Sequence, residues 1–225
     1  MAIRVVVADD HTVVRDGLRL ILEAEGDICG VGEGADGRKA VRQARSARPH
    51  VVVMDVSMPG LNGIEATRQI SELRPCPSVV ILSVHSNAEY VFQALKAGAR
   101  GYLLKESAGK EVVSAVRAVH AGRRYLSERI AGVVADDYLC RGSRSPAGEA
   151  LERLSSRERE VLQLVAEGKS SAEIAETIHL SRKTVDTYRS RLMQKLGIAN
   201  VPGLVRFAMA QGLIPLEPPP PPAHP

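Results

Sequence analysis

The chain has 225 residues, 44% hydrophobic and 25% charged, which is the profile of an ordinary soluble protein with room for two modest domains. Aromatic residues make up only 3%, with no Trp, which argues against a ligand pocket built from rings. Residues 1–120 hold 15 Lys/Arg against 14 Asp/Glu, whereas residues 154–216 hold 9 against 6. The positive excess of the C-terminal part fits a contact with nucleic acid.

Nothing in the sequence points to a membrane or to secretion. No apolar run approaches the ~20 residues that span a bilayer. The N-terminal residues MAIRVVVADD become acidic too soon for a signal peptide. Three distant cysteines, Cys29, Cys76 and Cys140, form neither a CxxC pair nor a zinc spacing. We therefore expect a cytoplasmic protein with reduced thiols and no membrane contact.

Short β-branched runs alternate with helical periodicity over the first 120 residues. Strands are expected at 3–8, 28–34, 51–55, 78–83 and 101–105, and helices at 12–24, 37–47, 62–73, 88–99 and 109–122. Near-continuous apolar strands are typical of a parallel sheet covered on both faces. The pattern predicts an α/β fold, a doubly wound five-stranded parallel sheet over residues 1–122, with its ligand site at the carboxyl ends of the strands.

Composition divides the remaining chain into three parts. Residues 123–150 include CRGSRSPAGEA and are expected to be a linker. Residues 151–215 are expected to form a small all-α domain of four helices. Residues 216–225 include five consecutive prolines and are expected to be a disordered, extended tail.

Polar residues follow four of the five expected strands. Asp9 and Asp10 follow the first, Asp55 ends the third, Ser83 ends the fourth and Lys105 ends the fifth. A lone Asp after a strand is usually a helix cap, but this combination is improbable by chance. Three crowded carboxylates repel one another, and a hard cation such as Mg²⁺ relieves the repulsion. A carboxylate beside Mg²⁺ and an ammonium group can attack a phosphoryl group to give an acyl phosphate.

The segments VVADDH, VVVMDVSMPGLNG, VVILSVH and GYLLKES resemble the receiver domain of two-component response regulators. The resemblance implies that Asp55 is the phosphoacceptor. It also implies that Mg²⁺ is held by Asp9, Asp10, Asp55 and the main-chain carbonyl of Ser57. Lys105 would pair with the phosphoryl group, Ser83 would supply the switch hydroxyl, and Tyr102 would turn inward on activation. His11 and His85 have no metal-ligand spacing, so we expect them to be loop or surface residues beside an all-oxygen site.

The C-terminal part has the pattern of a helix-turn-helix. Ser155 and Glu158 have the spacing of a capping box, at the start of a helix that Gly168 ends. A second helix should begin at Ser170 or Ser171, and a third near Ser181. In the third helix, a buried stripe is expected from Val185, Tyr188, Leu192 and Leu196.

The opposite face of the third helix carries short polar groups flanked by cations. We expect Lys183 and Thr187 to face base edges, with Asp186 a weaker candidate, while the flanking cations contact phosphates. The expected DNA-binding set is Arg182, Lys183, Thr184, Asp186, Thr187, Arg189, Ser190, Arg191 and Lys195. A merely solvated helix face is the alternative, disfavoured by the preceding helix-turn-helix pattern.

The segments SREREVLQLVAEGKSSAEIA and SRKTVDTYRSRLMQKLGI resemble the LuxR-type helix-turn-helix. With the receiver-like half, the chain resembles transcriptional regulators of the NarL/FixJ type. The resemblance implies a sensor histidine kinase, double-stranded promoter DNA and RNA polymerase as partners. It also implies a homodimer on DNA through a fourth helix, which Asn200 would cap and in whose first turn Pro202 would lie.

Three other functions fit these residues less well. A phosphatase with an aspartyl nucleophile needs a second Asp two residues after the first, where this chain has Ser57. A regulator that senses a small molecule needs an aromatic-lined pocket, which the composition disfavours. A regulator that works without phosphorylation would not need the intact acidic set. The expected function is therefore a DNA-binding response regulator and not an enzyme.

Overall fold

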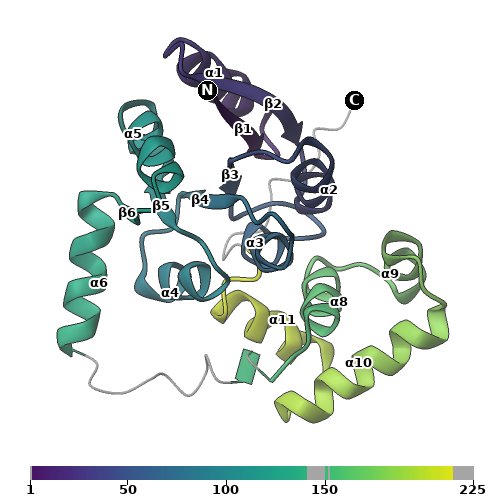
Figure 1. Cartoon of the computed structure of the whole chain (residues 1–225). Helices are drawn as coiled ribbons and strands as arrows, with labels where there is room; N and C mark the ends of the chain where they lie inside the picture. The colour runs from purple at the N-terminus through teal and green to yellow at the C-terminus, as the bar shows by residue number, and fades with distance from the viewer. Residues whose placement is uncertain (1, 141–149, 152, 215–225) are drawn as a thin grey trace, which may run out of the picture. The chain divides into compact units, whose positions relative to one another are not determined.

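The computed structural model describes residues 2–140, 150–151 and 153–214 (Figure 1). Two compact units make up the chain, residues 1–144 and residues 145–225, and each is described by itself. The predicted tail at 216–225 and the C-terminal part of the predicted linker, residues 141–149, lie outside the described residues. Within the described part, no helix is both long and apolar enough to cross a membrane.

The first unit is built on a parallel sheet. Its strands are β1 (Ile3–Ala8), β2 (Ile28–Gly34), β3 (Val51–Asp55), β4 (Ser78–Ser83), β5 (Gly101–Leu104) and β6 (Tyr125–Leu126). They are arranged in the order β2-β1-β3-β4-β5-β6, and each pairs with its neighbour in parallel. The predicted doubly wound sheet is confirmed, with the difference that β6 adds a sixth strand beside β5.

Helices cover both faces of this sheet (Figure 1). They are α1 (Thr12–Glu23), α2 (Gly37–Ala47), α3 (Gly63–Ser71), α4 (Ala88–Lys96) and α5 (Ala108–His120). Helices α1 and α5 contact each other on one face, and α2 and α3 contact each other on the other face, where α4 adjoins α3. Successive strand residues alternate between the two layers: Val5 and Val7 belong to the α1/α5 core, Val6 and Ala8 to the α2/α3/α4 core. Burial on both faces explains why the strands are apolar throughout.

The first unit extends further than the sequence indicated. Residues 123–140 were expected to belong to a linker, but they form β6 and α6 (Glu128–Cys140). Helix α6 contacts α4 and β5, and Ile130 is fully buried in the α2/α3/α4 core. A two-residue strand is too short to show alternation, and one buried isoleucine gives a weak helical period. The boundary expected at residue 122 therefore falls before the end of this unit.

Two glycines shape the loop between β3 and α3, directly after Asp55. Gly60 has φ +76°, a left-handed conformation that a side chain disfavours. A Cβ atom on Gly63 would lie 1.9 Å from the carbonyl oxygen of Asp55, so only glycine lets α3 start this close to the strand. The amide of Gly63 donates to the carbonyl oxygen of Val56 at 2.9 Å. Together they fix the backbone around the end of β3.

The second unit is helical: α8 (Ser156–Ala166), α9 (Ser171–Ile178), α10 (Arg182–Leu196) and α11 (Val201–Ala210). The predicted capping box of Ser155 and Glu158 is confirmed, and Ser170 and Glu173 form a second one. Asn200 caps α11 by accepting the amide of Gly203 at 2.9 Å, with Pro202 in the first turn, as predicted. In α10 the predicted stripe is buried at Val185 and Leu192 and half-buried at Tyr188 and Leu196.

Candidate functional site

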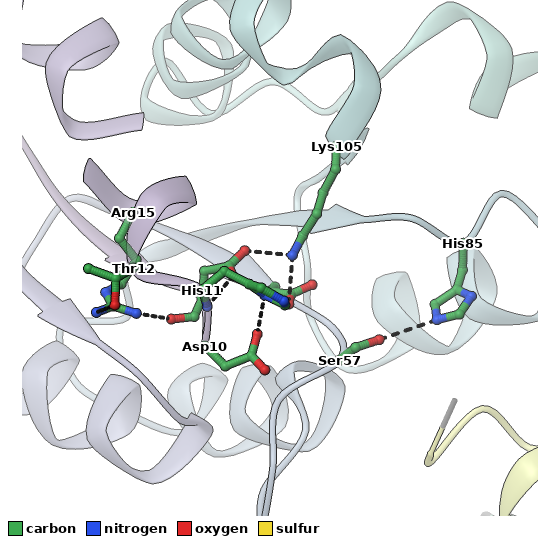
Figure 2. Close-up of polar contacts among 9 residues, drawn as sticks. Asp10, His11, Thr12, Arg15, Ser57, His85 and Lys105 are labelled. Carbon is green, nitrogen blue, oxygen red and sulfur yellow. Dashed lines mark hydrogen bonds and ion pairs between the residues drawn. The ribbon is translucent and has the colours of Figure 1, made fainter. Parts of the chain in front are cut away.

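An acidic cluster lies where β1 and β3 end side by side. Asp9 follows β1, Asp55 ends β3, and both carboxylates are buried. Lys105, which follows β5, places Nζ 2.7 Å from Oδ2 of Asp9 and 2.9 Å from Oδ2 of Asp55 (Figure 2). The parallel register brings these ends together, since Met54 of β3 pairs with Ala8 of β1 and Asp55 pairs with Leu82 of β4.

Two further residues complete the cluster. Nδ1 of His11 lies 2.8 Å from Oδ1 of Asp10 and 3.2 Å from Oδ1 of Asp9 (Figure 2). Ligand atoms of Asp9, Asp10, His11 and Asp55 all lie within 4.8 Å of one another. His11 is exposed, as expected for a loop residue, but its ring contacts the acidic pair. Three carboxylates face one ammonium group, and this excess of hard, negative oxygen atoms fits a divalent cation.

Burial and neighbouring charges shift the ionisation of the central pair. Desolvation raises the pKa of Asp55 above its ordinary value, an effect that the Lys105 ammonium opposes and the Asp9 carboxylate reinforces. Burial alone would lower the pKa of Lys105, but the carboxylates of Asp55 and Asp9 outweigh it, so the pKa is raised. Lys105 therefore stays charged, while the positive charge of Lys105 does not fully offset the burial of the Asp55 carboxylate.

A hydrogen-bonded group connects the end of β4 to β5 and to the loop after β3. The Tyr102 hydroxyl donates to the carbonyl oxygen of His85 at 2.8 Å, and the amide of His85 donates to Oγ of Ser83 at 3.0 Å. Nε2 of His85 lies 3.2 Å from Oγ of Ser57 (Figure 2), and its ring stacks on Tyr90 of α4 with centroids 4.2 Å apart. The Tyr102 side chain is fully buried, so the structure holds this ring in the inward position.

In the second unit, the expected DNA-binding residues fall into two groups. Arg182, Lys183, Thr187, Ser190 and Arg191 are exposed on α10, and Thr184 is half-exposed. The hydroxyl of Thr187 donates to the carbonyl oxygen of Lys183, and that of Ser190 donates to the carbonyl oxygen of Asp186. These hydroxyls keep their acceptor lone pairs for an outside donor.

The other three residues contact neighbouring helices. Oδ1 of Asp186 accepts the hydroxyl of Ser171 at 2.6 Å, and Arg189 donates to the same hydroxyl at 2.8 Å. Nζ of Lys195 lies 2.8 Å from Glu158, the acid of the first capping box. Asp186, Arg189 and Lys195 therefore hold the helices of this unit together.

Comparison with known proteins covers both units. The model of the response regulator receiver domain matches residues 5–117, and that of the bacterial regulatory proteins of the luxR family matches residues 152–208. The chain belongs to the response regulators with a LuxR-type DNA-binding domain.

Full-length relatives agree with this assignment. The oxygen regulatory protein NreC of Staphylococcus epidermidis is 36% identical over 215 residues, covering 94% of this regulator and 99% of NreC. The response regulator ChrA of a heme-sensing two-component system is 35% identical, with TM-score 0.51 over 95% of this regulator and 99% of ChrA. A complex of the response regulator RcsB with DNA is 28% identical, with TM-score 0.57 over 93% and 99%. The regulator is thus a DNA-binding member of the two-component systems.

Sequence reasoning missed the part that His85 plays in this regulator. Its ring and main chain reach Ser57, Ser83, Tyr102 and Tyr90. The available signal was its position two residues after Ser83, in the loop that leaves the sheet at the edge where the acidic cluster was expected. By sequence Asp186 is a weak candidate for reading bases, and nothing in the sequence indicates its bond to Ser171, fifteen positions away.

Proposed function

We propose that this regulator accepts a phosphoryl group on Asp55 from a sensor histidine kinase and that the phosphorylated state controls DNA binding by α10. The observation that carries the proposal is the contact of Lys105 with both Asp55 and Asp9 at the ends of adjacent strands. Sheets of this order bind ligands at the point where the strand order reverses, here between β1 and β3. Asp55 would therefore lie at the place where a ligand of such a sheet binds.

The cation in this proposal is Mg²⁺. Asp9, Asp10, Asp55 and the main-chain carbonyl of Ser57 would hold it, and it would offset negative charge on the phosphoryl oxygens. The buried, incompletely neutralised carboxylate of Asp55 supports this assignment. We propose an all-oxygen ligand set, with His11 acting through its contacts with Asp10 and Asp9.

The protein's own groups perform the remaining steps. A carboxylate oxygen of Asp55 forms the bond to phosphorus while the bond from phosphorus to the donor breaks and the donor leaves with the electron pair. Lys105, already bonded to Asp55, would then pair with the phosphoryl oxygens. Ser83 lies on the neighbouring strand, and its hydroxyl would turn from the amide of His85 toward the new group. This movement would disturb the His85 main chain, which also holds the Tyr102 hydroxyl.

On DNA, we propose that Lys183 and Thr187 face base edges, with Arg182, Thr184, Ser190 and Arg191 along the groove. Arg182, Lys183, Thr187, Ser190 and Arg191 are exposed on one helix, which supports a major-groove contact. Asp186, Arg189 and Lys195 would set the position of α10 through their contacts with other helices. The proposed assembly is a homodimer bound to promoter DNA in the cytoplasm, in contact with RNA polymerase and acting without enzymatic turnover of its own.

Phosphotransfer is tested by incubating the regulator with acetyl phosphate and Mg²⁺ and locating the added phosphoryl group by mass spectrometry. We expect the group on Asp55, none on Asp55→Asn, and unchanged labelling of Asp16→Asn, which removes an exposed acid of α1. DNA affinity should differ between the treated and untreated wild type. Equal affinities, together with labelling of Asp55, would favour a regulator that binds DNA independently of phosphorylation. Release of inorganic phosphate from a generic monoester would favour the phosphatase alternative.

A further inference from the structure

Helix α2 of the receiver carries a concentration of positive charge that the receiver's proposed chemistry does not use. Residues 36–48 contain Arg38, Lys39, Arg42, Arg45 and Arg48, and their one acid is Asp36. The rest of residues 1–120 holds 10 Lys/Arg and 13 Asp/Glu. The net charge of residues 1–120 is therefore close to zero because the strongly basic segment 36–48 offsets an acidic remainder.

These cations form one exposed face. Lys39, Arg42, Arg45 and Arg48 are exposed, whereas Ala40, Val41 and Ala44 are buried against the sheet and α3. At 100° per residue, Lys39, Arg42 and Arg45 fall within one third of the helix circumference and span about 9 Å along its axis. We name Lys39, Arg42 and Arg45 the α2 basic face. Helix α2 lies at the outer part of the sheet, beside β2 (Figure 1).

The α2 basic face is not neutralised by any acidic residue in the described part of the chain. Among the residues that the structure describes, Lys39, Arg42 and Arg45 form no ion pair. Other cations of the same unit do: Arg117 bonds to Asp27 and Glu25, and Arg129 bonds to Glu106. Asp36 caps α2, its side chain accepting the main-chain amide of Lys39 at 2.7 Å.

Helix stability alone does not explain this arrangement. Like charges three or four residues apart, as in Lys39–Arg42 and Arg42–Arg45, destabilise a helix. Cations in the first turn, Arg38 and Lys39, also oppose the helix dipole, and that turn holds no acid. A face that served solubility would mix both signs. The like-charge pairs and the cations in the first turn both destabilise the helix, and such an arrangement is consistent with a polyanionic partner.

We propose that the α2 basic face contacts the phosphate backbone of duplex DNA, as a second contact beside that of α10. The inference rests on the DNA-binding function of the regulator, because DNA is the polyanion that this function brings to the protein. The charged groups of lysine and arginine contact phosphates, and such contacts carry no sequence information. The α2 basic face would add affinity and salt dependence without changing the preferred sequence.

The test compares two triple variants of the full chain with equal charge change. Lys39→Gln/Arg42→Gln/Arg45→Gln removes the α2 basic face, and Lys110→Gln/Arg123→Gln/Arg124→Gln removes three exposed cations elsewhere on the same unit. Glutamine has a helix propensity close to that of lysine and arginine, and it carries no charge. Binding to a labelled duplex of arbitrary sequence is measured by fluorescence anisotropy between about 50 and about 200 mM salt.

We expect the α2 variant to bind at least about threefold more weakly at low salt than the matched control. Its slope of log affinity against log salt should be smaller in magnitude by about 1 to 3, since each phosphate contact contributes ~0.9. Equal affinities and slopes for the two variants would overturn the α2 contact and leave α10 binding intact. A wild-type chain that binds no duplex at any salt would overturn the proposed DNA binding itself.

Discussion

Ser171, the first residue of α9, donates its hydroxyl to Asp186 of α10 at 2.6 Å and accepts a hydrogen bond from Arg189 at 2.8 Å. One serine thereby joins the two helices of the helix-turn-helix at a fixed place. A recognition helix meets defined bases only if its position relative to its supporting helix is fixed. Two of the charged residues on α10, Asp186 and Arg189, thus contact α9 through this serine.

Asp186→Ala should destabilise the C-terminal unit by about 1–2 kcal/mol, because the Ser171 hydroxyl loses its acceptor. Asp186→Asn keeps an acceptor oxygen and should recover most of the loss. The measurement is amide hydrogen exchange over α9 and α10, which reports on this unit alone. An Asp186→Ala protein with native exchange rates and an altered base preference would show that Asp186 reads DNA instead.

Asp55→Asn should stabilise the receiver in the absence of Mg²⁺. Burial and Asp9 raise the pKa of Asp55 above 3.8, so the folded state binds the proton more tightly than the unfolded chain. Stability is therefore lost as the pH rises through that window, and ionised Asp55 is destabilising at neutral pH. We expect a gain of about 1–2 kcal/mol from the neutral amide. Added Mg²⁺ should raise the midpoint temperature of the wild type more than that of the variant.

The control for this prediction is Asp16→Asn, which removes an exposed acid from α1. It should leave both the midpoint temperature and the Mg²⁺ response close to those of the wild type. An equal Mg²⁺ response in Asp55→Asn would show that the cation binds elsewhere.

Tyr102→Phe should lower the free energy of unfolding of the receiver by about 1–2 kcal/mol, because the carbonyl oxygen of His85 loses its donor at a partly buried site. Tyr125→Phe is the matched control: its hydroxyl contacts Glu111 at 3.2 Å from a half-exposed ring on β6. Chemical denaturation of both variants compares the two losses. A Tyr102→Phe loss no larger than that of Tyr125→Phe would mean that this hydroxyl does not hold the β4–α4 loop.

The receiver should lose stability in mild acid through His50. Nδ1 of His50 accepts the amide of Arg4 at 3.1 Å, and its ring lies 5.0 Å from that of His120. Burial, Arg4 and His120 lower the pKa of His50 below 6.5 in the folded state. Well above pH 6.5 the ring is neutral in both states. As the pH falls below 6.5, the unfolded chain takes up the proton first, so stability decreases.

His50→Asn keeps an acceptor atom near the place of Nδ1 and removes the titration. The drop in unfolding free energy from about pH 7.5 to about pH 5.5 should be smaller in this variant than in the wild type. Identical drops would assign the acid sensitivity to other groups.

The sequence specified features that depend on near neighbours. The ranges predicted for β1, β2, β3, β4 and α2 agree with the structure to the residue, because apolar runs and helical periods are local. The capping box of Ser155 and the cap of Asn200 were predicted because each acts within three residues. The order of acids and lysine at the strand ends sufficed to predict that Asp9, Asp55 and Lys105 meet, because parallel strands end at one edge of the sheet.

The tertiary structure decided what depends on contacts between distant positions. The sixth strand forms because Tyr125 and Leu126 pair with the open edge of β5. No local sequence pattern predicts this pairing. His85 reaches Ser57 across 28 positions, and Asp186 reaches Ser171 across 15, so their roles follow from how the helices and strands pack. The sequence gives the chemical type of each side chain, whereas the fold determines its partner, because only packing fixes which groups lie within hydrogen-bonding distance.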